Sequence, residues 1–337
     1  MNIIREYNGF KVLQDSPSKY YVSNKDGEMV SAVTIGAALD ILEDLIVLDL
    51  EKTGQYRVLV NRKFYLVNVQ GFMMLLNFRK GETMMTSHIL KYGVYEGPET
   101  AFVKHFLKPG MVCMDVGAHI GYHTLLMASL VGKNGKVHSF EVDRKLMCVL
   151  MDNVWVNRIK TVSWYGSALS DVDGVVKYVT GNSILSNDDS GIECASWTAD
   201  SFARKYRPGK IDFVKIDTSG YDCKVLSGMR GVIERNPNIV IMMEYNPSLF
   251  ALFGSSNDDL LGLLNDYGMG AVFLTGDRCV EKYGFGLFNP IEPKEYLSSM
   301  RHITKVYSSD PDREVLSLIC AKPDVLRRVS GGAEVVC

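Results

Sequence analysis

The chain has 337 residues, of which 47% are hydrophobic and 23% charged, and its formal net charge at pH 7 is -2. This length is enough for one large core or two smaller ones, and the composition is that of an ordinary globular protein. A nearly neutral chain has no global positive field to attract nucleic acid or an anionic membrane.

The N-terminus, the apolar windows and the cysteines bear on where the protein resides. The first ten residues, MNIIREYNGF, contain no apolar core before a cleavage site, so the sequence predicts no signal peptide. The most apolar window, 37–50, is interrupted by four acidic residues, which excludes a membrane span there. Seven cysteines are scattered without a C-x-x-C pair. This pattern is typical of a reduced, cytoplasmic protein and argues against a disulfide framework or a zinc knuckle.

Residues 1–90 are expected to form a small α+β extension. Alternating patterns, helical periodicity and turn residues predict a hairpin, a helix, two strands and one further apolar run, over 20–30, 34–50, 55–69 and 72–78. The hairpin turns at Asp26-Gly27. Nothing in this extension carries chemistry. It is either a substrate cap, a module that forms a homo-oligomer, or a purely structural addition.

From residue 91 to residue 325, short apolar runs alternate with amphipathic segments, which is typical of a parallel α/β sheet covered on both faces. Strands are expected over 111–115, 136–141, 161–165, 213–217, 239–244, 271–274 and 315–321. A loop that leads into a helix is expected over 93–107, and helices are expected over 122–131, 144–156, 197–206, 221–230 and 258–267. An inserted hairpin is expected over 174–189 and a flexible tail over 326–337.

The stretch 111–121, MVCMDVGAHIG, joins the first of these strands to a helix through a glycine turn. Asp115 ends the strand, Gly117 allows backbone to approach a ligand, and Gly121 allows the helix to pack without a side-chain clash. This is the layout of a ligand loop at the carboxyl end of a strand. The spacing D-x-G-x-x-x-G lacks the third close glycine that a pyrophosphate requires, which favours S-adenosylmethionine over a dinucleotide.

The next strand ends in Glu141, and an acidic residue at this position accepts hydrogen bonds from the two ribose hydroxyls of an adenosine ligand. Asp115 is expected either to order the glycine loop or to bind the amino group of the methionine half. The two strand ends together predict a nucleoside-cofactor site.

The motifs DVGAHIGYHTLL, FEVD, SAL, WTADSF, VKIDTSGYDCKVLSGM and IMMEYNP occur in this order, and the chain resembles the FkbM family of methyltransferases over about residues 92–322. The resemblance implies a class I fold, a Rossmann-like seven-stranded sheet with helices on both faces. It implies S-adenosylmethionine as cofactor and a hydroxyl on a sugar, glycan or small natural product as acceptor. It also places Ala118 in the cofactor loop and Ser167 and Ala168 beside the adenine.

Three positions depart from the family pattern. His119 stands where the family usually has Asn, and Val142 stands where it usually has Pro. In the family's D-V-E-G motif, Ser219 replaces the Glu. If that Glu contributes to metal or substrate binding in relatives, its replacement here has to come from Asp222 or Glu244.

The candidate catalytic residues are Asp217, Glu244 and His119, because the ends of the first, fourth and fifth strands converge in such a sheet. Asp217 would either lie next to the transferred methyl group or cap the following turn. Glu244 would either line the acceptor pocket or be a surface acid. His119 would act as a base or hydrogen-bond the cofactor or the backbone. His119 and His123 are spaced as a metal pair, but no third ligand is evident, so we expect no metal.

Two other functions stay open. An RNA methyltransferase would be expected to show a D/N-P-P-Y/F motif after strand four and a basic excess, and the chain has only a basic patch within 204–210. A non-catalytic scaffold would explain the missing Glu.

Overall fold

The computed structural model describes residues 2–7, 10–16, 19–23, 28–32, 56–58, 65–76, 85–86, 89, 93–179, 184–186, 191–274 and 316–331. The chain divides into two compact units, Met1–Tyr95 and Glu96–Cys337.

The first unit contains two antiparallel sheets. The strands of one are β1 (Asn2–Tyr7), β2 (Phe10–Ser16), β3 (Lys19–Ser23) and β4 (Met29–Ala32), and those of the other are β5 (Tyr56–Val58), β6 (Tyr65–Val69) and β7 (Phe72–Leu76). The pairing of β3 with β4 and of β5 with β6 confirms the expected strands. The Asp26-Gly27 turn and the expected helix over 34–50 lie outside the described residues.

The second unit is built on a seven-stranded sheet. Its strands are β8 (Val112–Val116), β9 (Lys136–Phe140), β10 (Val162–Tyr165), β15 (Phe213–Ile216), β16 (Val240–Tyr245), β17 (Gly270–Leu274) and β18 (Leu316–Ala321). Their order is β10-β9-β8-β15-β16-β18-β17, and β18 runs antiparallel to both of its neighbours. Every strand lies within one residue of its expected bounds, so the predicted α/β sheet is confirmed.

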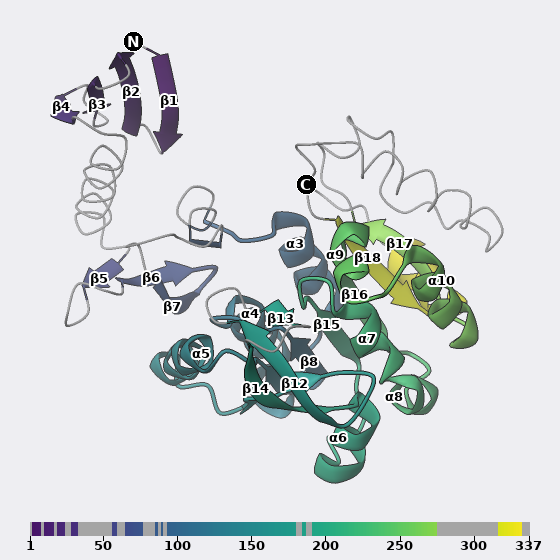
Figure 1. Cartoon of the computed structure of the whole chain (residues 1–337). Helices are drawn as coiled ribbons and strands as arrows, with labels where there is room; N and C mark the ends of the chain where they lie inside the picture. Colours follow the sequence, from purple (N-terminus) through teal and green to yellow (C-terminus); the bar gives the residue numbers. More distant parts are fainter. Residues whose placement is uncertain are drawn as a thin grey trace. The chain divides into compact units, whose positions relative to one another are not determined.

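Helices flank this sheet in Figure 1. They are α3 (Gly97–Phe106), α4 (Tyr122–Val131), α5 (Arg144–Val156), α6 (Ala199–Tyr206), α7 (Asp222–Ser227), α8 (Arg230–Arg235), α9 (Pro247–Leu252), α10 (Asn257–Asp266) and α13 (Pro323–Gly331). The side chains of β9 show that helices cover both faces of the sheet. Successive residues of a strand point to opposite faces. Ser139 hydrogen-bonds Thr124 of α4, whereas its neighbours His138 and Phe140 pack their rings against Phe202 of α6.

The helix starts follow capping rules. The side chain of Asp143 accepts from the backbone N–H of Lys145 at 2.7 Å to cap α5, and Thr198 caps α6 in the same way. The prediction of a single helix over 221–230 is wrong, because the chain forms two helices, α7 and α8, with a break at Gly228. A Cβ on Gly228 would lie 2.0 Å from the carbonyl oxygen of Ser170, so this close backbone contact bends the chain.

A second sheet in this unit has the order β11-β14-β12-β13, with β11 (Ala168–Leu169), β12 (Gly174–Val179), β13 (Ile184–Ser186) and β14 (Ile192–Trp197). The hairpin expected over 174–189 is therefore part of a larger element. The following helix begins at Ala199 and not at residue 197, because the preceding residues form β14 and pair with β12.

Residues 326–331 of the expected flexible tail belong to helix α13, which runs to Gly331. Val325 and Leu326 are buried, and Leu326 lies against β17 near Gly270. The rest of the expected tail, 332–337, lies outside the described residues. Within the described part of the chain, no helix is long and apolar enough to cross a membrane.

Candidate functional site

The candidate site lies at the carboxyl ends of β8 and β15, neighbouring parallel strands in the centre of the sheet. Asp115 on β8 is paired in register with Lys215 on β15, and the backbone N–H of Asp217 donates to the carbonyl of Val116 at 2.9 Å. The chain leaves β8 toward its neighbour β9 on one side, and β15 is the neighbour of β8 on the other side. The strand order therefore reverses here, which is where open α/β sheets bind ligands.

The glycine loop after β8 packs directly against the end of β15. Gly117 has φ +82°, and a Cβ there would lie 1.8 Å from the carbonyl oxygen of Asp217. The backbone N–H groups of Gly117 and Ala118 donate to the carbonyl of Phe140 at 3.0 and 2.9 Å. Gly121 has φ +94°, and a Cβ there would lie 3.1 Å from Leu150 of α5. The close backbone contact therefore requires glycine at Gly117, and the positive φ favours glycine at both positions.

Glu141 lies directly after β9 and is 2% exposed. Its Oε2 atom accepts from the backbone N–H of His119 at 2.8 Å, and Oε1 accepts from that of Asp143 at 2.8 Å. The side chain therefore fixes the glycine loop to the end of β9 and to the start of α5.

Asp115 is fully buried. Its Oδ2 atom accepts from the hydroxyl of Thr124 at 2.5 Å, which ties the end of β8 to α4. Its Oδ1 atom is buried and has no hydrogen-bond partner in the described part of the chain. Burial raises the pKa of this carboxyl group, against the opposing effect of the Lys215 ammonium.

Lys215 is a site residue that the sequence reasoning missed. It is 5% exposed, and its Nζ atom lies 2.7 Å from Oδ2 of Asp217. Burial acts to lower the pKa of this lysine, but the carboxylates of Asp217, Glu96 and Asp115 outweigh it and raise the pKa above its ordinary value. The only sequence signal is the K-x-D spacing, which places Lys215 and Asp217 on the same face of a strand.

Two further acidic residues lie at this edge of the sheet. Asp222 accepts from the backbone N–H groups of Thr218 at 3.2 Å and Gly220 at 3.0 Å, so it orders the turn after β15. Burial, followed by the charge of Asp217, raises its pKa to about 7. Glu244 has a buried Oε2 atom without a hydrogen-bond partner among the described residues. Burial, and then Asp217 and Asp222, raise its pKa well above its ordinary value.

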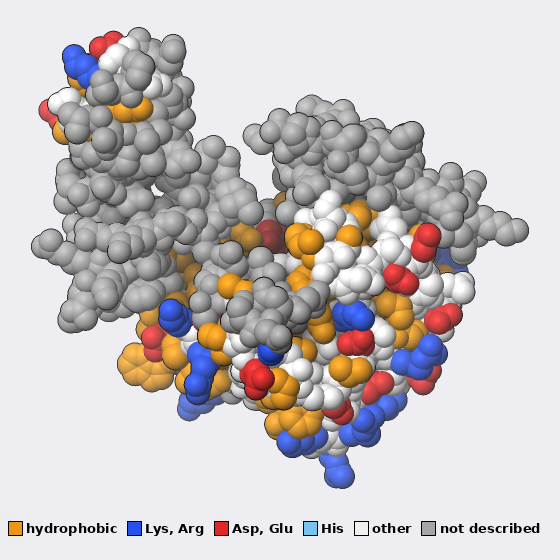
Figure 2. All heavy atoms as spheres, viewed as in Figure 1, with side chains coloured by type: hydrophobic (Ala, Val, Ile, Leu, Met, Phe, Trp, Pro, Cys, Tyr) orange, Lys and Arg blue, Asp and Glu red, His pale blue; other side chains and the backbone are white. Residues whose placement is uncertain are grey.

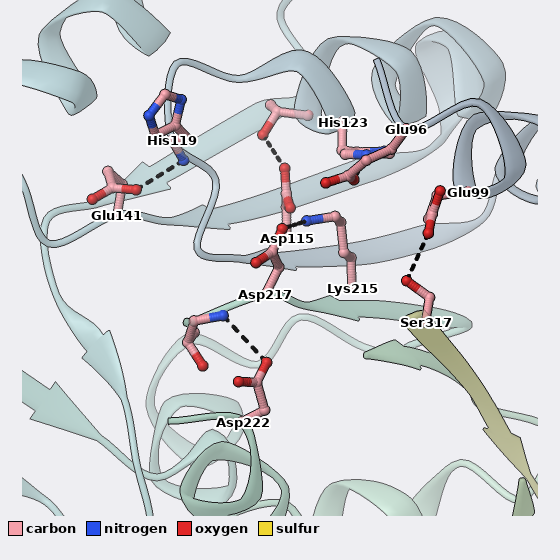
Figure 3. Close-up of polar contacts among 12 residues, drawn as sticks. Glu96, Glu99, Asp115, His119, His123, Glu141, Lys215, Asp217, Asp222 and Ser317 are labelled. Atoms are coloured by element: carbon pink, nitrogen blue, oxygen red, sulfur yellow. Dashed lines mark hydrogen bonds and ion pairs between the residues drawn. The ribbon is translucent and has the colours of Figure 1, made fainter. Parts of the chain in front are cut away.

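Helices α3 and α4 contribute further groups (Figure 3). Glu96, at the start of α3, lies 2.8 Å from Nε2 of His123, and Glu99 accepts from the hydroxyl of Ser317 at 2.9 Å. Neither glutamate belongs to a recognisable motif. His119 has φ 52°, and burial lowers its pKa. His123 is engaged by Glu96, and the described residues contain no group of three or more metal-ligating side chains.

Ser167 and Ala168 follow shortly after β10 in the chain, and both are buried. Ala168 belongs to β11 and pairs with Ser196 of β14, so this residue is part of the second sheet. Whether these residues contact adenine stays a prediction.

Four buried polar atoms on the glycine loop and at the ends of β8, β15 and β16 have no hydrogen-bond partner among the residues that the structure describes. They are Oδ1 of Asp115, Nδ1 of His119, Oγ1 of Thr218 and Oε2 of Glu244. Buried polar atoms normally have partners, so a ligand with several polar groups fits here. S-adenosylmethionine has such groups in its amino acid and ribose. The sheet order with its antiparallel β18, the glycine loop and the acid after β9 together define a class I methyltransferase.

The family model described as "Methyltransferase FkbM domain" matches residues 115–269. This segment contains the motifs of the glycine loop, of β9 and of β15, so the match agrees with the resemblance that the sequence motifs predict. A comparison with curated proteins gave no match.

Solved structures with similar folds include an rRNA methylase from Streptococcus thermophilus, with 10% identity, TM-score 0.38 and coverage of 66% of this chain and 93% of that chain. A Streptococcus mutans protein in complex with SAH has 10% identity, TM-score 0.39 and coverage of 67% and 98%. Precorrin-6y C5,15-methyltransferase from Geobacter metallireducens has 14% identity, TM-score 0.37 and coverage of 67% and 87%. These low scores carry no argument about the acceptor.

Proposed function

We propose that the chain methylates a hydroxyl group on a sugar, glycan or small natural product, with Glu244 as the group that accepts the hydroxyl proton. The observation that carries this proposal is the Oε2 atom of Glu244, which is buried and has no hydrogen-bond partner among the described residues. Glu244 follows Met243, which pairs in register with Ile216, so it lies on the strand next to Asp217. This supports a place beside the transferred methyl group.

When bound, S-adenosylmethionine supplies an electrophilic methyl group on its sulfonium. A neutral hydroxyl is a weak nucleophile, and a positioned base that takes its proton accelerates the reaction. Burial and the neighbouring Asp217 and Asp222 raise the pKa of Glu244, which makes its carboxylate a stronger base than an exposed glutamate. Glu244 would take the proton that the hydroxyl oxygen loses when it gains the methyl group, while the methyl–sulfur bond breaks and the neutral thioether leaves.

On the cofactor side, we assign Glu141 to the ribose hydroxyls and Asp115 to the methionine amino group. Burial and the unpartnered Oδ1 atom of Asp115 support the second assignment, because an ammonium group would satisfy it. The remaining proposed contacts come from the glycine loop and from the segment after β10, at Gly117, Ala118, Gly121, Ser167 and Ala168. His119, with its unpartnered Nδ1 atom, is assigned to a hydrogen bond with the cofactor.

The replacement of the family Glu by Ser219 bears on activity. Asp222 is already engaged by two backbone N–H groups of the turn, whereas Glu244 keeps an unpartnered oxygen. An acidic group is therefore available on the acceptor side, which favours an enzyme over a scaffold.

The basic patch within 204–210 offers little support for an RNA acceptor. Arg204 donates to Ser201, Lys205 lies 4.3 Å from the ring centre of Trp197, and Lys210 pairs with Asp212. On the face shown in Figure 2, Lys and Arg side chains are interspersed with Asp and Glu side chains over the described part of the second unit. These contacts support a solvated face.

The test is methyl transfer from radiolabelled S-adenosylmethionine to separated small-molecule, glycan and RNA fractions of a cell extract. We expect label in the small-molecule or glycan fraction, and loss of that label in Glu244→Gln with cofactor binding retained. Glu234→Gln is the matched control, because Glu234 is an exposed glutamate on α8. Label in RNA alone would refute the acceptor class. Cofactor binding without label in any fraction would refute the enzyme and favour the scaffold.

A further inference from the structure

We propose that the outer edge of β10, with the exposed aromatic side chains that flank it, is the surface through which two copies of this chain form a symmetric dimer. In this dimer β10 of each copy pairs antiparallel with β10 of the other, so that the two seven-stranded sheets become continuous. Strand β9 separates β10 from β8 and its glycine loop. The inference therefore goes beyond the proposed function and does not depend on it.

Strand β10 is an end strand of the seven-stranded sheet. It pairs with β9, and among the described residues no strand pairs with its other edge. An edge strand presents N–H and C=O groups that another extended strand can satisfy, and monomeric proteins commonly protect such an edge with charged side chains, proline or a bulge. The four residues of β10, VSWY, include no charge and no proline, and their register with β9 has no bulge. The edge is therefore open to a further strand.

An apolar surface flanks this edge on one face of the sheet. Trp164 is paired in register with Ser139, which faces α4, so Trp164 points to the same face and is 40% exposed. Helix α5, which leads into β10, covers this face as well, because successive right-handed crossovers in one direction place their helices together. On α5, Trp155 is 78% exposed and Met151, one turn earlier, is 38% exposed.

The opposite face of the edge also carries exposed aromatic surface. Tyr165 points to that face, and its ring centre lies 5.2 Å from that of Tyr206 on α6, which is 44% exposed. With 150–250 Å² for each aromatic side chain, the exposed parts of Trp155, Trp164 and Tyr206 amount to roughly 350 Å². This is somewhat less than half of the about 800 Å² that each partner buries in a stable interface. The paired strands and the facing helices supply the remainder.

The charges around Trp155 identify a second copy of the chain as the partner. Asp152 and Arg158 are both exposed, and they lie three residues before and three residues after Trp155. A twofold axis near Trp155 makes the two α5 helices run in opposite directions, so that Asp152 of each copy faces the partner's Arg158. The patch is thus complementary to itself, as a twofold interface requires.

The experiment is sedimentation equilibrium of the full chain between about 1 and 100 μM, which detects dissociation constants in the micromolar range. We expect the wild type to reach twice the chain mass of 37.6 kDa. Trp155→Lys and Trp164→Lys should each raise the dissociation constant at least about 30-fold, since they replace a central aromatic side chain by a charge. Val175→Lys is the matched control, because Val175 is a 64% exposed apolar residue of β12, in the second sheet, and it should leave the dissociation constant unchanged.

A charge exchange tests the twofold contact itself. Asp152→Arg should weaken the dimer because it places like charges together, and the double variant Asp152→Arg/Arg158→Asp should restore it. Urea unfolding checks that each variant retains the fold. A monomeric wild type at the highest concentration would overturn the proposal. A dimer that persists in Trp155→Lys, or a double variant that does not recover, would also overturn it. None of these measurements involves the cofactor, so their failure leaves the proposed function untouched.

Discussion

Replacement of Gly117 by alanine is the sharpest test of the glycine loop. The new Cβ would lie 1.8 Å from the carbonyl oxygen of Asp217, whereas ordinary contact begins near 3.4 Å, so the two backbones must separate by about 1.6 Å. Neither neighbour is a flexible side chain that could rotate away. The positive φ adds about 1–2 kcal/mol of strain for any residue with a Cβ, and the overlap adds about 1–3 kcal/mol.

The strain acts on stability, and the overlap acts on binding, because the loop can relieve the overlap only by leaving the position that receives the cofactor. We therefore expect the affinity for S-adenosylmethionine to fall about 5- to 150-fold, at 1.4 kcal/mol for each factor of ten. Calorimetric titration measures this loss, and denaturant unfolding measures the accompanying loss of stability.

Gly110→Ala is the matched control for Gly117→Ala. Gly110 has φ +89°, but nothing lies within 4 Å of a Cβ built there. It carries the same backbone strain without the overlap, so it should lose about 1–2 kcal/mol of stability and no affinity. If Gly117→Ala binds the cofactor as well as Gly110→Ala does, the loop is not the cofactor loop, and the reasoning from close approach is refuted.

Two further predictions concern carboxyl groups of the same unit. Glu141→Ala should weaken S-adenosylmethionine and S-adenosylhomocysteine equally, by about tenfold or more, because both contain the ribose that this acid would bind; unchanged titrations would contradict its role. Burial and Glu96 raise the pKa of Glu99 to about 7. Between the ordinary pKa of a glutamate and this value, the folded state retains a proton that the unfolded chain releases, so the stability of the wild type falls as the pH rises. The free energy of unfolding of Glu99→Gln should therefore rise by up to about 3 kcal/mol relative to that of the wild type as the pH increases from about 4.5 to 7, as measured by urea unfolding. A difference in unfolding free energy that does not change with pH would contradict this.

The sheet could be predicted closely because its signals are local. The five parallel strands β8, β9, β10, β15 and β16 are short, largely apolar runs that end at or beside a glycine or an acid. The strand-end rule then singles out Asp115 and Glu141 without knowledge of any contact. The break at Gly228 could not be predicted in this way. It depends on the carbonyl of Ser170, more than fifty residues earlier in the chain, which approaches Gly228 only in the folded structure.

Lys215 was missed for a related reason. In the sequence, the K-x-D spacing points only to Asp217, and the register of β15 against β8 is needed to place Lys215 opposite Asp115. Glu96 and Glu99 precede β8 and belong to no motif. Their approach to the carboxyl edge of the sheet therefore also depends on how the helices pack.

The same contacts separate the roles of the acidic residues. From the sequence, Asp217 could have capped the turn or faced the methyl group, and Asp222 or Glu244 could have replaced the missing family Glu. In the structure Asp222 takes the backbone N–H groups of the turn, and Lys215 takes Asp217. Glu244 is left with an oxygen that no described residue satisfies. Because a base must have a free acceptor position within reach of its substrate, the partners of the other two carboxylates are what make Glu244 the strongest candidate for proton transfer.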